Sequence, residues 1–86
     1  MPHVLHLIKD PANRTALDVI AQQAADSSVR LSIVLLQDAA TRLKEALPGD
    51  VCRLDEGQAA DGSPHPAITH AQLLELIFTA DTVVTW

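Results

Sequence analysis

Four short apolar runs divide the chain, at residues 4–8, 31–36, 51–54 and 81–86. Each run is short and rich in aliphatic or β-branched residues, which predicts a β-strand. The run at 31–36 is almost continuously hydrophobic, as is typical of a central strand buried on both faces of a parallel sheet. The last run carries Trp86, the only tryptophan, and predicts a strand held in the sheet with its large ring packed on another surface.

Between these runs, apolar residues recur at helical spacing, which predicts three amphipathic helices. Their inner stripes are Leu17, Ile20, Ala21 and Ala24; Ala39, Leu43, Ala46 and Leu47; and Leu73, Leu74, Leu76, Ile77 and Ala80. Pro48-Gly49 follows the second stripe and predicts the end of that helix.

Three polar positions predict where these helices begin. Asp10 precedes Pro11, so we expect the Asp10 carboxylate to cap the first helix, with proline at its first position. Asp38 is expected to cap the second helix in the same way. Thr69 stands three residues before Gln72, the spacing of a capping box, and this pair predicts the start of the third helix.

The order of elements is β-α-β-α-β-loop-α-β, with residues 55–67 as the loop. Strands that alternate with helices predict an α/β fold in which right-handed crossovers join parallel strands. We expect residues 1–86 to form one small three-layer, flavodoxin-like domain with a mainly parallel sheet of about four strands. Ligands bind such folds at the carboxyl ends of the strands. That edge is predicted to gather Lys9-Asp10, Gln37-Asp38 and Asp55-Glu56.

Composition narrows the class of protein. The hydrophobic fraction of 48% favours a packed core, while the formal charge of −5 disfavours direct binding to nucleic acid. There is no basic leader resembling a signal peptide and no apolar stretch long enough to span a membrane. A single cysteine argues against an internal disulfide framework and CxxC motifs. These features predict a cytoplasmic domain without membrane contact.

Cys52 is the candidate catalytic residue, and two roles remain open for it. In one, its thiolate carries sulfur as a persulfide, with Arg53 lowering the pKa of the thiol. In the other, Cys52 is a small buried apolar side chain. Position favours the second role: Cys52 comes two residues after Asp50, so we expect it at the amino edge of the sheet, away from the ligand-binding ends of the strands.

The four histidines give a weak metal signal. His3 and His6 are three residues apart on a strand, so they are expected to point to opposite faces and not to share a metal. His6 is more typical of a hydrogen-bonded core or interface residue. His65 and His70 flank a proline turn without a recognisable ligand spacing, although Asp61 or Asp55 could join them. We therefore predict no metal site.

The other candidate catalytic and nucleotide-binding residues also have ordinary structural explanations. The carboxylates of Asp10, Asp55 and Glu56 have the acidity for acid–base work, but such residues at strand ends are usually caps or solvated loop charges. The three glycines match neither a GxGxxG pattern nor a phosphate-binding loop. We therefore expect no nucleotide and no other cofactor.

Three motifs together resemble one family. The opening Leu5-His6-Leu7-Ile8-Lys9-Asp10-Pro11 is similar to the first strand of the DsrH/TusB subunits of the DsrE-type sulfur-relay family. Leu35-Leu36-Gln37-Asp38 resembles the end of their second strand. The last helix and strand, ending on Trp86, are similar to the carboxyl-terminal part of those subunits. The resemblance covers the whole chain in order and length.

This resemblance implies a DsrEFH-like fold and a non-catalytic subunit of a persulfide-transfer complex, active in tRNA thiolation or sulfur oxidation. Its expected partners are a DsrE/TusD-like subunit, which carries the essential cysteine in that family, and a DsrF/TusC-like subunit. Interface residues are expected at Trp86, His6 and Lys9. Three alternatives remain: a sulfurtransferase that carries persulfide on Cys52, a stand-alone domain that binds a small ligand, and a homo-oligomer.

Overall fold

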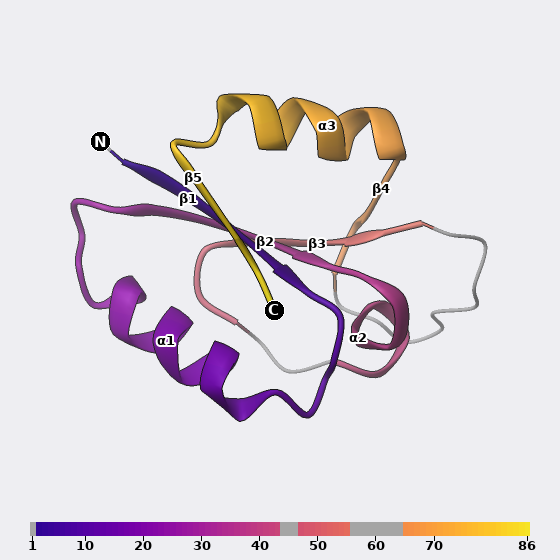
Figure 1. Cartoon of the computed structure of the whole chain (residues 1–86), viewed down its shortest axis with the longest axis horizontal. Coiled ribbons are helices and arrows are strands. Elements are labelled where there is room, and N and C mark those ends of the chain that lie inside the picture. The colour runs from indigo at the N-terminus through magenta and orange to yellow at the C-terminus, as the bar shows by residue number, and fades with distance from the viewer. Residues whose placement is uncertain (1, 44–46, 56–64) are drawn as a thin grey trace.

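Parallel strands form one sheet, and helices cover both of its faces (Figure 1). The computed structural model describes residues 2–43, 47–55 and 65–86. In these ranges the sheet has five strands in the order β4-β3-β2-β1-β5. Their bounds are β1 (His3–Ile8), β2 (Arg30–Leu35), β3 (Asp50–Leu54), β4 (Ala67–Ile68) and β5 (Thr82–Thr85). The predicted α/β architecture with a parallel sheet is confirmed.

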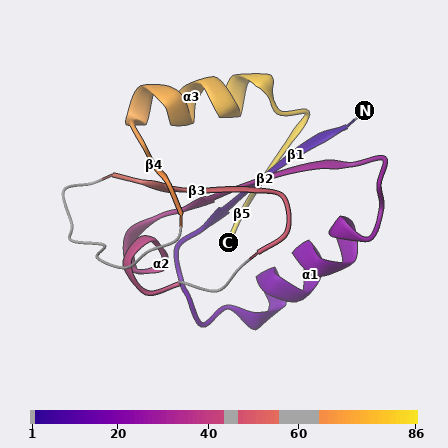
Figure 2. The same ribbon diagram turned by 180° about the vertical axis from the view of Figure 1, so that it is seen from behind.

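The helices form two unequal layers. Helices α1 (Arg14–Ala24) and α2 (Gln37–Arg42) lie on one face, and α3 (His70–Thr79) lies on the other (Figures 1 and 2). Handedness explains this division. The connections through α1 and α2 lead from β1 toward β3, whereas the connection through α3 leads back across the sheet to β5. Right-handed crossovers in opposite directions place their helices on opposite faces.

The expected number of about four strands is corrected to five. The added strand, β4, overlaps the segment that was predicted as a loop. It has only two residues and follows Pro66, so it carries no alternation that would reveal it in the sequence. Its hydrogen bonds to β3 are nonetheless regular: Arg53 N–H donates to the Pro66 carbonyl (2.9 Å), and Asp55 N–H donates to the Ile68 carbonyl (3.0 Å).

The strand order also differs from the flavodoxin-like order 2-1-3-4-5. From β1 the chain runs outward through β2 and β3 to β4, and then returns to the other side of β1 as β5. The direction of winding therefore reverses between β1 and β5. The carboxyl ends of these two strands are the topological switch point of the sheet.

Two apolar clusters form the core, one on each face of the sheet. The cluster under α1 and α2 includes Ile8, Ile20, Ile33, Leu35, Ala39 and Ala40, all fully buried. The cluster under α3 is centred on Leu5, Val34 and Leu54. Alternation along the strands explains the division, because neighbouring residues of a strand point to opposite faces. Both faces of β1 and β2 are therefore apolar, as the nearly continuous hydrophobic run predicted.

Helix starts were predicted with mixed success. The capping box of α3 is confirmed: Gln72 N–H donates to Oγ1 of Thr69 (3.2 Å), and Thr69 N–H donates to Oε1 of Gln72 (2.8 Å). The prediction for Asp10 is wrong, because the side chain of Asn13 caps α1 instead. Oδ1 of Asp10 accepts from Ala12 N–H (2.9 Å) and so stabilises the turn before the helix.

The second helix also differs from its prediction. Leu36, and not Asp38, is the residue that precedes α2, and no side chain caps the helix there; Asp38 lies in its first turn. The helix ends at Arg42, because Leu43 already has an extended conformation. Ala46, part of the predicted stripe, lies outside the described residues. Gly49 has a φ of +89°, and a Cβ there would lie 2.8 Å from the Leu31 carbonyl oxygen, so only glycine fits.

Candidate functional site

Backbone hydrogen bonds join the carboxyl ends of β1, β2 and β5. Leu36 N–H donates to the Ile8 carbonyl (2.8 Å), and Trp86 N–H donates to the Leu7 carbonyl (2.9 Å). These bonds continue the parallel ladders on both sides of β1. The three segments that carry the family resemblance therefore meet at one edge of the sheet, although they lie far apart in the sequence.

A strained turn holds the second motif segment, Leu35-Leu36-Gln37-Asp38, in place. Gln37 has a φ of +51°, in the left-handed region that costs a residue with a side chain about 1 kcal/mol. Directly after this turn, Ala39 N–H donates to the carbonyl of Lys9 (3.1 Å), which ties the start of α2 to the end of β1. The side chains of Lys9, Gln37 and Asp38 are exposed at this edge. Local strain of this kind is common at functional sites.

Beneath this edge, His6 joins β1 to α1 and to the last residue described. The imidazole is fully buried, with Nε2 of His6 2.6 Å from Oε1 of Gln23. The indole N–H of Trp86 donates to Nδ1 of His6 (3.0 Å), and the two rings stack with centroids 6.1 Å apart. An indole N–H can only donate, so Nδ1 accepts and Nε2 carries the hydrogen that bonds Gln23. His6 is therefore a neutral, fully hydrogen-bonded histidine.

The predicted interface residues differ in exposure. Lys9 is exposed, Trp86 is half-buried, and His6 is enclosed by its own chain. The interpretation of His6 as a hydrogen-bonded core residue is confirmed. Gln23 was not singled out in the sequence, because a polar residue at a helical position gives no sign of a partner on a strand. A partner that binds at this edge can contact Lys9 and the exposed part of Trp86. The Trp86 ring is held in position by His6, which is itself bonded to Gln23.

Cys52 lies nearer the carboxyl ends of the strands than predicted. It pairs with Val34, which pairs in turn with Leu7, so Cys52 is level with the carboxyl half of β1. The expectation of an amino-edge position is therefore wrong. The reason is stagger: β3 begins opposite Ser32, the third residue of β2. Register of this kind depends on how strands pair, and it leaves no mark in the sequence of β3 itself.

The surroundings of Cys52 suppress its reactivity. Its side chain packs into the cluster under α3, on the opposite face from His6 and Trp86, with Sγ 3.7 Å from the Ile33 carbonyl oxygen. Burial raises the pKa of the Cys52 thiol, and the nearby charge of Asp50 raises it further. Since the thiolate is the reactive form, both effects oppose nucleophilic chemistry.

A buried histidine–serine pair was not anticipated. Nε2 of His3 lies 2.7 Å from Oγ of Ser32, and both residues are almost completely buried. The backbone of His3 also exchanges hydrogen bonds with Asp81: His3 N–H donates to Oδ2 (2.7 Å), and Asp81 N–H donates to the His3 carbonyl (2.8 Å). The His3–Ser32 pair satisfies two polar groups inside the sheet, and the bonds to Asp81 anchor the start of β5 to β1. Only the register of β1 and β2 reveals it.

The expected separation of His3 and His6 is confirmed, since His3 points toward α3 and His6 toward α1. His65 is buried and His70 is exposed. Among the residues described, no group of three histidine, cysteine or carboxylate side chains is placed to hold a metal ion. Asp61, which was considered with His65 and His70, lies outside the described residues, as does Glu56 of the acid–base candidates; Asp55 is exposed.

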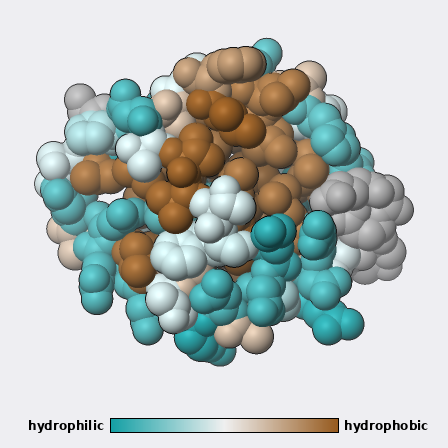
Figure 3. All heavy atoms as spheres, in the orientation of Figure 1, coloured by the Kyte–Doolittle hydropathy of each residue, from teal (hydrophilic) through white to brown (hydrophobic). Residues whose placement is uncertain are grey.

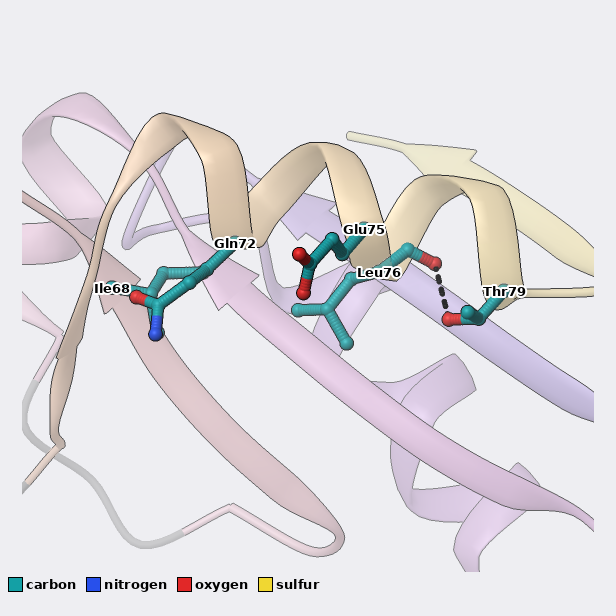
Figure 4. A pocket seen from close by; sticks show the side chains of 5 residues that line it. All are labelled: Ile68, Gln72, Glu75, Leu76 and Thr79. Atoms are coloured by element: carbon teal, nitrogen blue, oxygen red, sulfur yellow. Dashed lines mark hydrogen bonds between the residues drawn. The ribbon is translucent and has the colours of Figure 1, made fainter.

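The α3 side of the molecule carries a groove and an exposed apolar surface. The groove, with a volume of about 340 Å³, runs along one flank of α3 (Figure 4). Its lining consists of Ile68, Gln72, Glu75, Leu76 and Thr79. Large apolar side chains are exposed nearby: Leu74 by 54%, Phe78 by 83% and Val83 by 39%. Figure 3 shows apolar residues gathered over α3 and continuing toward β5.

Comparison with known proteins adds no relative: no family model, curated protein or solved structure matches the chain. In the described part of the chain, no helix has the length and apolarity needed to cross a membrane. The functional evidence therefore lies in the chain's own residues. Two features distinguish them: motif segments that converge at one edge of the sheet, and a cysteine thiol whose pKa is raised by burial.

Proposed function

We propose that this chain is a small non-catalytic subunit of a cytoplasmic sulfur-relay complex, supporting a DsrE/TusD-like catalytic partner. One observation carries the proposal. The three segments that resemble DsrH/TusB subunits meet in space, with His6 bonded to Trp86 and Leu36 bonded to Ile8. Their convergence places Lys9 and the uncovered part of Trp86 on one edge of the sheet, where a partner subunit can bind. The DsrEFH-like form of the fold belongs to the same proposal.

A supporting role fits the chemistry of Cys52 better than a catalytic one. A persulfide carrier needs a thiolate that attacks the sulfur donor, and therefore a thiol with a lowered pKa. Burial and Asp50 raise the pKa of Cys52 instead. The thiol also lies on the other face of the sheet from Trp86. The essential cysteine would come from the DsrE/TusD-like partner, and a DsrF/TusC-like subunit would complete the assembly.

Within such a complex, the carboxyl edge of the sheet offers a contact surface. Lys9 supplies a cation, and Trp86 supplies a large ring that is already held by the hydrogen bond to His6. Tryptophan is enriched among the residues that dominate binding energy at interfaces, and little ordering entropy is lost when the ring is held in advance. The pathway served, tRNA thiolation or sulfur oxidation, depends on the partners.

Reconstitution with its partners tests this role. The chain is co-expressed with the DsrE-like and DsrF-like subunits of its own genome, and the mass of the native complex is measured. We expect a stable complex whose sulfur transfer needs this chain and is unchanged by Cys52→Ser. In parallel, the isolated chain is incubated with a persulfide donor and its intact mass is taken. Addition of one sulfur atom that disappears in Cys52→Ser would overturn the non-catalytic role.

A further inference from the structure

The two edges of the sheet are built differently. One edge is β4, which has only two residues and follows a proline, both of which discourage pairing with another strand. The other edge is β5, with four uncharged β-branched residues, Thr82-Val83-Val84-Thr85. Natural proteins protect open edges with charges, prolines or bulges, and β5 has none of these devices within its length. In the described part of the chain no strand pairs with the outer side of β5, so this edge can accept a further strand.

Helix α3 continues this unprotected surface. None of its ten residues is buried, and Leu74 and Phe78, four positions apart on one flank, are among the most exposed apolar side chains described. Val83 pairs with Leu5, whose side chain packs under α3, so Val83 points to the same side of the sheet. We call Leu74, Phe78 and Val83 the α3–β5 face. In Figure 3 apolar residues gather over α3, while polar residues occupy the lower half of the same view.

Carboxylates border the α3–β5 face, and α3 and β5 themselves contain no lysine or arginine. Glu75 lies one turn from Phe78 on α3, and Asp81 lies two residues before Val83; both are exposed. From His65 to Trp86 there is neither lysine nor arginine. All six basic residues are earlier in the chain: Lys9, Arg14, Arg30, Arg42, Lys44 and Arg53. The face therefore has an apolar centre with an acidic rim.

We propose that the α3–β5 face binds a different protein chain, which adds a strand to β5 and surrounds its own apolar centre with lysine or arginine. The inference rests on the proposed function and names a second surface, besides the carboxyl edge of the sheet, through which a partner subunit docks. Strand addition provides main-chain hydrogen bonds, and Leu74 and Phe78 provide the side-chain contact. Opposite charges around the rim steer the partner and fix its register.

The same charges disfavour a second copy of this chain. A two-fold contact through the α3–β5 face would bring four carboxylates around one apolar centre, with no lysine or arginine from α3 or β5 to balance them. A copy that offered its own basic residues instead would use a different surface. Such a head-to-tail contact closes only if its rotation completes a ring. A distinct, basic partner satisfies both the charge and the geometry.

Binding of the co-expressed DsrE-like and DsrF-like subunits tests the proposal with matched variants. Phe78→Ser removes the most exposed apolar side chain of the face, and we expect it to weaken binding about tenfold or more. Glu75→Lys reverses a rim charge and should weaken binding several-fold at low salt, with little difference left at about 1 M salt. Asp18→Lys makes the same charge change on exposed α1 and should leave the dissociation constant within about twofold.

The outcomes separate the two proposals. If the complex forms and both α3 variants bind as tightly as Asp18→Lys, the docking surface is wrong while the subunit role stands. If no complex forms with the unaltered chain, the subunit role fails and the docking proposal with it. A self-dimer in sedimentation that Phe78→Ser dissolves would show that a second copy occupies the face. Thermal melting of each variant confirms that the substitutions leave the fold intact, as expected for exposed positions.

Discussion

The two faces of the sheet are finished to different degrees. Under α1 and α2, side chains from both sheet and helices are fully buried, including Ile20, Ile33 and Ala39. Under α3, the sheet contributes buried residues such as Leu5 and Val34, but the helix contributes none. The first face, which we call the finished face, is covered within one chain, and we call the second the open face. The second has the character of an interface, where large apolar side chains remain to be covered.

The sequences of the helices explain the difference. Charged and polar residues of α1, such as Arg14, Asp18 and Gln22, cover its outer side. In α3, five large apolar residues fall within six positions: Leu73, Leu74, Leu76, Ile77 and Phe78. An amphipathic helix needs about three to four apolar residues per two turns to cover a core. The surplus in α3 cannot all face the sheet, so Leu74 and Phe78 remain outside.

A matched pair of truncations tests the comparison most strongly. Ile33→Ala removes a fully buried side chain from the finished face, and we expect the free energy of unfolding to fall by about 2–5 kcal/mol. Phe78→Ala removes a larger side chain from the open face and should change it by no more than about 0.5 kcal/mol. Urea unfolding of both variants at one protein concentration measures the two values. Equal losses would mean that the outer side of α3 is already packed in the isolated chain.

The next test concerns Trp86, which packs on the finished face from the edge strand. Trp86→Ala removes a half-buried ring and the donor to Nδ1 of His6, and should cost about 2–3 kcal/mol. Trp86→Phe keeps most of the packing but leaves that buried nitrogen without its donor, and should cost about 1–2 kcal/mol. Asp38→Asn, an exposed change at the same edge, is the control.

The free energy of unfolding in urea, measured for the Trp86 and Asp38 variants, tests these expectations. If Asp38→Asn were as harmful as Trp86→Ala, the ring would not anchor the edge. If Trp86→Phe were harmless, the bond to His6 would be unimportant for stability. Either result would remove the reason for treating the convergence of the three motif segments as a built structure.

Local patterns predicted much of this molecule. Apolar runs located four of the five strands, and Thr69-Gln72 located the start of α3, because strand and cap preferences act over a few neighbouring residues. The predicted inner stripes were wrong at three positions, because Ala21, Ala24 and Leu74 are exposed.

The assignment of Asp10 as a cap failed because several polar residues near a helix start compete, and Asn13 took the position in α1. The assignment of Asp38 failed because α2 already begins at Gln37, after Leu36, and no side chain caps it.

Pairing between distant segments could not be read in this way. The position of Cys52 relative to the strand ends, the bond between His3 and Ser32, and the two-residue strand β4 all depend on register. So does the meeting of His6 with Trp86, eighty positions apart. The family resemblance grouped His6 and Trp86 as expected interface residues, but it gave no hint that one holds the other. Side-chain partners across a sheet follow from how strands are paired, and a single sequence shows only the strands.

The smallest expected effect concerns Cys52, whose side chain packs from β3 into the cluster under α3. Because burial and then Asp50 raise the pKa of its thiol, less thiolate is present at any pH than in the unfolded chain. Alkylation by iodoacetamide, followed by intact mass across pH, should therefore show a midpoint above that of the chain in urea. Asp50→Asn should lower the midpoint slightly, and by less than unfolding does, since burial is the larger cause.

Salt distinguishes the effect of Asp50 on the pKa of the Cys52 thiol from the effect of burial. Asp50 is exposed, and Arg30 pairs with it across 3.7 Å at the surface, so its effect on Cys52 should shrink at about 1 M salt. The effect of burial should persist, because it comes from the apolar side chains packed around the thiol. A midpoint below that of the unfolded chain would mean that the fold stabilises the thiolate. The layer beneath α3 would then be a site of sulfur chemistry, and this subunit would carry sulfur itself.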